Sequence, residues 1–71
     1  MQPEKKEKIK GVILEAFSDG MFKVKLETGK EILAYLAGKM RIYRIKVLPG
    51  DKVIVEISHY DENKGRIIRR L

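Results

Sequence analysis

The chain has 71 residues, with 16 Lys or Arg against 10 Asp or Glu, and its formal net charge is +6. A chain this short builds one small hydrophobic core, so we expect a single domain over residues 1–71 with no deep active site. With no cysteine and one histidine, it has neither disulfide bonds nor a Cys/His metal cluster, and nothing indicates a cofactor or a small-molecule substrate. The excess of positive charge favours a polyanionic partner.

The N-terminal segment, residues 1–7, consists mainly of charged side chains and is expected to be a flexible arm. It lacks the apolar run of a secretory signal, and no later stretch approaches the length of a membrane span. We therefore expect a soluble, cytoplasmic protein that makes no contact with membranes.

Five apolar runs rich in β-branched residues predict five strands, at residues 9–17, 21–26, 31–36, 52–57 and 66–70. The second run is the most regular, because Phe22, Val24 and Leu26 alternate with outward-facing positions as a half-buried strand requires. Glycine-containing turn signals separate the runs at residues 18–20, 27–30, 49–51 and 61–65. This spacing suits consecutive antiparallel strands.

Strict alternation fails between the third and fourth runs, where Ile42 and Ile45 are three residues apart. One or two helical turns are expected there, followed by an extended segment that ends at the Pro49 turn. Five short strands with a helical insert between the third and fourth match the all-β OB-fold, a five-stranded Greek-key barrel. An SH3-like barrel is the nearest alternative.

The charge is unevenly distributed along the chain. Residues 1–38 contain seven lysines and six carboxylates, whereas residues 39–71 contain nine basic residues and four carboxylates. All five arginines lie in the second part. Arginine has a planar guanidinium that suits phosphates and base edges, so the second part is expected to provide the binding face.

The helical insert carries the first candidate RNA-binding cluster: Lys39, Met40, Arg41, Arg44 and Lys46. A loop with four cations and no carboxylate can enter a groove of folded RNA. The flexible Met40 side chain could pack against a base or into the core. The alternative is a solvated loop in which Ile42 and Ile45 only close the end of the barrel.

The last strand and the turn before it carry the second cluster, which includes Lys64, Arg66 and Arg69. Alternation predicts that Arg66 and Ile68 face one side of the strand, with Ile67 and Arg69 on the other. The alternative is a basic edge strand whose charges discourage aggregation.

The third cluster, Lys23, Lys25 and Tyr35, lies on the second and third strands, where OB-folds commonly bind nucleic acid. The chain has five aromatic residues in all, and Phe22 is expected to be buried, with Tyr43 and Tyr60 packed at the barrel ends. So few aromatics argue against stacking of several bases and favour folded RNA, bound through phosphates and grooves.

An enzymatic function is not indicated. Nucleophilic catalysis needs a base oriented beside the nucleophile, whereas Ser58 and His59 are neighbours at a strand end, where adjacent side chains point apart. His59 is expected at the surface or the barrel rim. Asp61 is expected to cap the turn and Glu62 to be solvated, and no phosphate-binding glycine loop is present.

Three motifs at matching intervals make essentially the whole chain resemble bacterial translation initiation factor one: Gly38-Lys39-Met40-Arg41, Pro49-Gly50-Asp51-Lys52-Val53 with Val55-Glu56, and Tyr60-Asp61 with Lys64-Gly65-Arg66-Ile67. The resemblance implies an OB-fold protein that binds the small ribosomal subunit near the decoding A site. There it would contact ribosomal RNA and a neighbouring ribosomal protein, and would act with initiator tRNA and two larger initiation factors. We expect the protein to be a monomer.

By the same resemblance, Lys39, Met40 and Arg41 would enter the minor groove of the decoding helix, with Arg44 and Lys46 beside them. The residues expected at RNA phosphates, or at the same edge, are Lys64, Arg66, Arg69 and Tyr60. The sequence departs from the family pattern at His59, where proline is common, and at Tyr35, where histidine is common. The remaining alternatives are a cold-shock-like RNA chaperone and a barrel whose basic face binds an acidic protein.

Overall fold

The structure is a computed structural model that describes residues 7–43, 45–58 and 60–71. It contains five strands and one helix: β1 (Lys8–Ala16), β2 (Met21–Leu26), β3 (Glu31–Leu36), α1 (Gly38–Ile42), β4 (Lys52–Ile57) and β5 (Lys64–Arg70). All five predicted strands and the helical insert are confirmed, and β5 begins two residues earlier than expected. The predictions made for Arg44, for His59 and for residues 1–6 of the arm lie outside the described residues.

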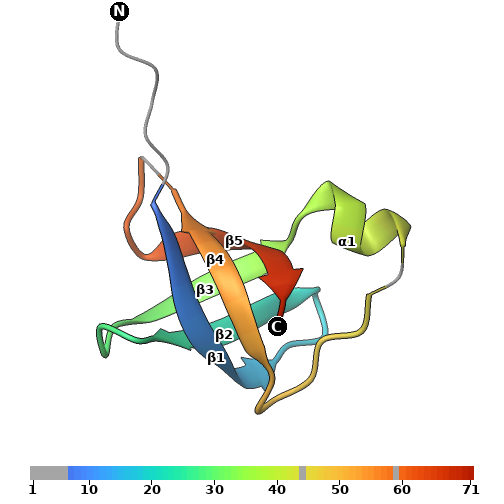
Figure 1. Cartoon of the computed structure of the whole chain (residues 1–71), viewed down its shortest axis with the longest axis horizontal. Helices are drawn as coiled ribbons and strands as arrows, with labels where there is room; N and C mark the ends of the chain where they lie inside the picture. The colour runs from blue at the N-terminus through green and yellow to red at the C-terminus, as the bar shows by residue number, and fades with distance from the viewer. Residues whose placement is uncertain (1–6, 44, 59) are drawn as a thin grey trace, which may run out of the picture.

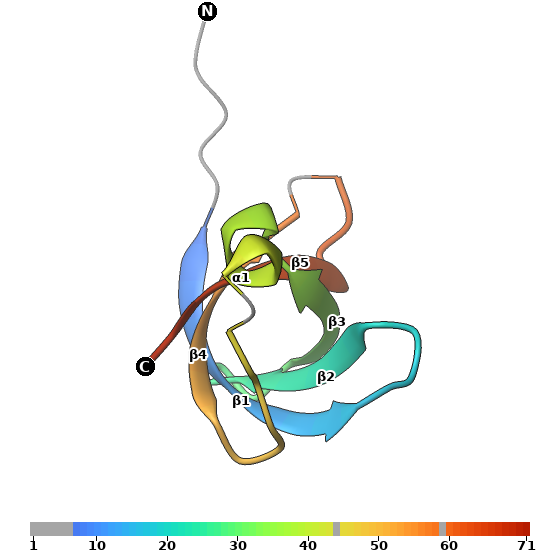
Figure 2. The same ribbon diagram turned by 90° about the vertical axis from the view of Figure 1, so that its right-hand side faces the viewer.

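The strands form a closed barrel in the order β1-β2-β3-β5-β4 (Figures 1 and 2). Every pairing is antiparallel except that of β3 with β5, which is parallel. A five-stranded barrel with a helix between its third and fourth strands is the OB-fold that the sequence predicts. The parallel pairing brings Tyr35 beside Arg66, two residues far apart in the sequence.

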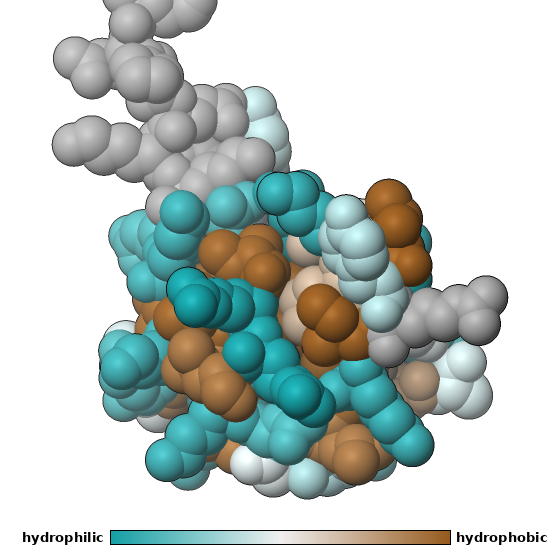
Figure 3. Space-filling view, turned by 45° about the vertical axis from the view of Figure 1, so that its right-hand side comes forward, coloured by the Kyte–Doolittle hydropathy of each residue, from teal (hydrophilic) through white to brown (hydrophobic). Residues whose placement is uncertain are grey.

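The surface mixes polar and apolar side chains. On the face shown in Figure 3, hydrophobic side chains are interspersed with hydrophilic ones and do not gather into one broad patch.

The helix in the described part of the chain has five residues, and it is too short to cross a membrane.

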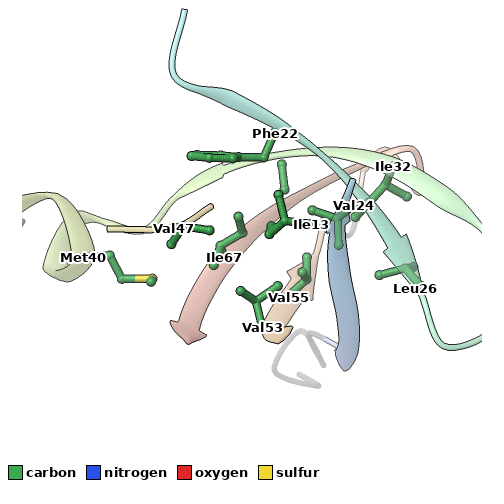
Figure 4. Close-up of a cluster of buried hydrophobic side chains, with 11 residues drawn as sticks. Ile13, Phe22, Val24, Leu26, Ile32, Met40, Val47, Val53, Val55 and Ile67 are labelled. Carbon is green, nitrogen blue, oxygen red and sulfur yellow. The ribbon is translucent and has the colours of Figure 1, made fainter. Parts of the chain in front are cut away.

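The core lies inside the barrel and is formed by alternate residues of the strands, with additions from the helical insert (Figure 4). As predicted, Phe22, Val24 and Leu26 point inward. Figure 2 shows α1 in front of the barrel opening, and Met40 enters the core from it with 1% of its surface exposed. The buried set is Ile13, Phe22, Val24, Leu26, Ile32, Ala34, Met40, Val47, Val53, Val55 and Ile67.

The alternative in which Ile42 and Ile45 close the barrel end is wrong. Ile42 is 75% exposed, and Ile45 is also at the surface. Met40 and Val47 are buried in their place. A helix of five residues directs few of its side chains toward the barrel. Here the side chain that reaches the core is that of Met40, which is long and flexible.

The segment after α1 is tied to the barrel at both ends. The Arg70 guanidinium donates a hydrogen bond from Nη1 to the backbone oxygen of Lys46, at 3.1 Å. At the following turn, Gly50 donates its backbone N–H to the oxygen of Ile13, and its φ of +93° is one that side-chain-bearing residues rarely adopt. The loop between α1 and β4 is therefore positioned by contacts with β5 and β1.

A β-bulge in β5 corrects the predicted alternation of its arginines. Val55 of β4 pairs with Ile67, but the preceding residue, Ile54, pairs with Arg69, so Ile68 is an extra residue in β5. After the bulge, Arg69 faces outward with Ile54, whereas Ile67 faces the core. The prediction that Ile67 and Arg69 share a face is thus wrong, and Arg66 and Arg69 both lie on the outer face.

Candidate nucleic-acid interface

Tyr35 lies at the centre of a row of outward-facing residues that crosses four strands. It pairs with Met21 of β2 on one side and with Arg66 of β5 on the other, and Arg66 pairs in turn with Glu56 of β4. A second row runs beside it, in which Leu33 of β3 pairs with Lys23 and Lys64. The fold therefore brings together members of the second and third clusters, which the sequence shows as separate segments.

The helical insert joins the same surface through Arg41. The guanidinium carbon of Arg41 lies over the Tyr35 ring, 5.9 Å from its centroid. An exposed cation–π contact of this kind contributes roughly 0.5–1 kcal/mol. Burial of Met40 and a backbone hydrogen bond from Ala37 to Ile67, at 2.8 Å, hold α1 against β5. The resulting surface is called the cationic face, and it consists of Lys23, Tyr35, Arg41, Lys64, Arg66 and Arg69.

Two cations of the cationic face are paired with carboxylates. Arg66 forms an ion pair with Glu56, whose side chain is 14% exposed, and the Lys23 ammonium lies 3.2 Å from a carboxylate oxygen of Glu31. Arg41, Lys64 and Arg69 make no ion pair with a described residue. The Lys23–Glu31 pair is exposed and contributes about 0–1 kcal/mol, so a phosphate can replace Glu31 at modest cost.

Three other predicted site residues lie away from the cationic face or are hidden. Met40 is in the core, so its side chain offers no surface to RNA in this conformation. Lys46 is exposed beside the end of β5, next to Arg70. Lys25 pairs with Val12 of β1 and lies at the far end of β2 from Tyr35. A fourth predicted residue, Lys39, is exposed on α1 two residues before Arg41.

The predicted packing of two tyrosines at the barrel ends is wrong. Tyr43 is 73% exposed and Tyr60 is 85% exposed. Tyr43 is the C-cap residue of α1, and Tyr60 lies in the turn before β5, where its backbone N–H donates to Ser58 Oγ. With Tyr35 also exposed, all three tyrosines of the chain present their rings at the surface.

Sequence reasoning did not identify a role for Glu56. It lies on the outer face of β4, and its position opposite Arg66 depends on the β4–β5 register. Because Val55 and Ile57 of this strand were expected to face inward, Glu56 between them was expected to face outward. That pattern could have indicated Glu56 as a partner for an arginine on the neighbouring strand.

The turn before β5 is built as the sequence predicts. Asp61 Oδ1 accepts the backbone N–H of Asn63 at 2.9 Å, and Ser58 Oγ accepts the N–H of Asp61 at 3.2 Å. Glu62 is exposed, and one of its oxygens lies 3.5 Å from the Lys30 ammonium. In the part of the chain that the structure describes, no group of three His, Cys, Asp or Glu side chains could hold a metal ion. Asp61 and Ser58 therefore have structural roles in this turn.

A closed OB-fold barrel with a basic outer face belongs to the class of small oligonucleotide-binding domains. Comparison with known proteins identifies one family within this class. The model of the family described as "Translation initiation factor 1A / IF-1" matches residues 1–71. The chain belongs to this family of translation initiation factors, which is not an enzyme class.

Two solved structures are similar to this chain, which spans most of the first and a small part of the second. Translation initiation factor one from the Wolbachia endosymbiont strain TRS of Brugia malayi has 40% sequence identity and a TM-score of 0.77, over 93% of this chain and 78% of that chain. YjeQ from Thermotoga maritima has 30% identity and a TM-score of 0.73 over 92% of this chain, which spans only 23% of YjeQ. The resemblance to initiation factor one is therefore confirmed.

Proposed function

We propose that this protein binds the small ribosomal subunit at the decoding A site, where it contacts ribosomal RNA and blocks entry of tRNA. The family supports the ribosome as the target. The observation that supports this mode of binding is the position of Tyr35, which contacts Arg41 of α1 and pairs with Arg66 of β5, so that the helical insert and β5 share one surface. A protein that acts by occupying a site needs such a surface and needs no reacting groups.

The cationic face is suited to phosphates, and α1 is suited to a groove. Arginine and lysine side chains neutralise phosphates and release their counterions, which provides most of the sequence-independent affinity. Lys39 and Lys46 are exposed on α1 and on the segment that follows it, so groove contacts can add to contacts with phosphates. Tyr60 and Tyr43 offer exposed rings for stacking on an unpaired base.

Contacts with the barrel hold α1 and the backbone at Lys46 in place before binding. Met40 is anchored in the core, Ala37 is bonded to Ile67, and Arg70 holds the backbone at Lys46. A surface that is ordered before binding loses less conformational entropy when the complex forms. The proposed mechanism is therefore docking of a preformed face.

The partners of this function are ribosomal RNA, a neighbouring ribosomal protein and the two larger initiation factors. The protein acts as a monomer in the cytoplasm. Its occupancy of the A site excludes elongator tRNA while the initiation complex assembles. Arg44 lies outside the described residues, and its proposed RNA contact rests on the sequence.

Co-sedimentation with purified small ribosomal subunits tests the proposal. The unchanged protein should sediment with the subunits, and Arg41→Glu and Arg66→Glu should each reduce the bound fraction strongly at about 0.1 M salt. Lys10→Glu is a matched control, because it makes the same reversal of charge on an exposed side chain of β1, a strand that pairs with neither β3 nor β5. Unchanged binding by both arginine variants would rule out the cationic face.

The three exposed tyrosines favour one alternative, a cold-shock-like RNA chaperone that stacks bases. Such a protein should bind unstructured oligonucleotides tightly. Tight binding of this kind without any binding to small subunits would support the chaperone and contradict the ribosomal proposal.

A further inference from the structure

The turn between β1 and β2 contains the only Asp-Gly step in the sequence, Asp19-Gly20. Both residues are exposed, and so are the residues before them from Leu14 onward. The step lies outside the strands, since β1 ends at Ala16 and β2 begins at Met21. It is therefore accessible to water and to another protein, and the proposed RNA contacts do not use it.

The side chain of Asp19 is folded back along its own backbone. Its Oδ1 accepts the backbone N–H of Met21 at 3.1 Å, as in other aspartate turns. The nitrogen of Gly20 lies between these two bonded groups along the chain. The hydrogen bond therefore keeps the carboxyl group of Asp19 beside the Gly20 nitrogen.

That nitrogen carries no shielding side chain. The φ of Gly20 is +86°, which glycine adopts readily, and a Cβ built there would meet nothing within 4 Å. The Gly20 N–H donates a long hydrogen bond, at 3.2 Å, to the backbone oxygen of Phe17. The nitrogen is thus open to reaction with the carboxyl group next to it.

The other two aspartates of the chain lack one or the other of these features. Asp51 Oδ2 accepts the N–H of Leu48, a residue that precedes it, so its carboxyl group is directed away from the following peptide bond. Asp61 binds the N–H of Asn63 as Asp19 binds that of Met21, but the next residue is glutamate, whose side chain hinders the nitrogen. Asp19 combines the folded-back carboxyl group with a glycine.

We propose that Asp19-Gly20 is a site of isoaspartate formation, and that the product is a substrate for a repair methyltransferase. The Gly20 nitrogen attacks Cγ of the protonated Asp19 carboxyl group, an N–Cγ bond forms, and water leaves with the proton of the nitrogen. Water then adds to the main-chain carbonyl carbon of the resulting succinimide and breaks its bond to the nitrogen. The water lost is regained and nothing is oxidised, so this isomerisation needs no co-reactant.

The repair step acts on the carboxylate that isomerisation releases. In isoaspartate the main chain runs through Cβ and Cγ, and the former main-chain carbonyl group becomes a free carboxylate. A carboxyl methyltransferase transfers the methyl group of S-adenosylmethionine to an oxygen of this carboxylate, with S-adenosylhomocysteine as the leaving group. The exposure of residues 14–20 gives such an enzyme access to the folded chain.

Isomerisation alters the end of a hairpin that carries part of the cationic face. The main chain gains one carbon between residues 19 and 20, and the Asp19 oxygen that holds Met21 is displaced. Met21 pairs with Tyr35 of β3, and it accepts the N–H of Phe17 at 2.8 Å. The change therefore begins beside the strand residues that surround Tyr35. The chemistry itself does not depend on the proposed function, so either can fail alone.

Timed incubation of the full chain at neutral pH over several weeks tests the proposal. Samples are digested with trypsin, and isoaspartate in each fragment is measured with purified isoaspartyl methyltransferase and labelled S-adenosylmethionine. Asp19 lies in fragment 11–23, Asp51 in 47–52 and Asp61 in 53–64, where any deamidation of Asn63 is recognised by its change of mass. Label should accumulate in fragment 11–23 and exceed that of Asp51 and Asp61.

Two variants and a peptide provide the controls. Asp19→Glu keeps the charge but would need a larger ring, so label in fragment 11–23 should be lost. Asp19→Asn should gain label faster than the unchanged chain, because its amide yields the same succinimide more readily. A synthetic peptide of residues 11–23 gives the rate without the fold, and the folded chain should react at a comparable rate. Circular dichroism confirms that the variants are folded, as expected for exchanges of an exposed side chain.

Three results would overturn the proposal. Label in the peptide but not in fragment 11–23 of the folded chain would show that the hairpin protects the step. Equal label in the unchanged chain and in Asp19→Glu would place the isoaspartate elsewhere. An aged, undigested chain that accepts no methyl groups, although its fragment 11–23 does, would contradict recognition of the folded protein by the repair enzyme.

Discussion

Arg66 of β5 is ion-paired with Glu56 of β4, directly across the two strands, so a central cation of the cationic face is held by a carboxylate before RNA binds. Glu56 is mostly buried, whereas Arg66 is more accessible. A phosphate that approaches Arg66 competes with Glu56 and is repelled by it. Glu56 therefore holds the Arg66 guanidinium beside β4 and at the same time limits its attraction for any polyanion.

Replacement of Glu56 by glutamine should tighten binding to small ribosomal subunits by about threefold at low salt, because one repelling charge next to the phosphates is removed. The free energy of unfolding should fall by less than about 1 kcal/mol, since glutamine can still accept a hydrogen bond from Arg66. Glu27→Gln, which makes the same change of charge on an exposed side chain in the turn after β2, beside β1, should leave affinity unchanged. Weaker binding by Glu56→Gln would show that the ion pair chiefly positions Arg66.

Met40 should be the residue of α1 on which stability depends. Met40→Ala removes a side chain that is 1% exposed and should lower the free energy of unfolding by about 2–4 kcal/mol. Ile42→Ala, two residues away on the exposed side of the helix, should change it by less than about 0.5 kcal/mol. Urea denaturation followed by circular dichroism measures both, and equal losses would contradict the placement of Met40 in the core.

Replacement of each of two glycines by alanine should change the stability of the protein in opposite directions. A Cβ at Gly65 would lie 2.7 Å from Val55 Cγ1 and 3.0 Å from the backbone oxygen of Glu56, so Gly65→Ala should cost about 1–3 kcal/mol of stability. A Cβ at Gly38, the first residue of α1, meets nothing within 4 Å, and Gly38→Ala should stabilise the protein by about 0.4–1 kcal/mol. Thermal unfolding of the two variants gives the signs directly. Stabilisation by Gly65→Ala would mean that β4 and β5 are not so closely apposed.

The contact between Arg41 and Tyr35 should couple the helical insert to the strands. Tyr35→Phe keeps the ring and should bind small subunits as the unchanged protein does, whereas Tyr35→Leu should weaken binding about twofold to fivefold. In a double-mutant cycle with Arg41→Gln, the two changes should show a coupling free energy of about 0.5–1 kcal/mol. Additive effects would show that Tyr35 and Arg41 act independently.

Much of the fold follows from local pattern. The strands were predictable because inward residues such as Val24 and Leu26 alternate with polar ones, and the turns because glycines such as Gly50 occupy positive φ. The bulge at Ile68 was not predictable, because it appears only in the register of β5 against β4. The choice of Met40 over Ile42 as the buried residue likewise depends on how α1 meets the barrel.

The candidate site was predicted as separate clusters, and the fold determines how they combine. The parallel pairing of β3 with β5 places Tyr35 beside Arg66, a relationship that no local pattern contains. The same topology separates Lys25 from Tyr35 and places it with Lys10 and Lys52. Charge position along the chain therefore indicates candidate binding residues, and long-range strand pairing determines which of these candidates lie together.

Chemical footprinting of ribosomal RNA in small subunits tests the central claim most directly. The unchanged protein should protect nucleotides of the decoding A site and should compete with tRNA for it, whereas Arg66→Glu at the same concentration should leave those nucleotides reactive. Lys10→Glu, which makes the same reversal of charge on β1, should protect them like the unchanged protein. Protection confined to another region of the subunit, or an A site that accepts tRNA with the protein bound, would contradict the account.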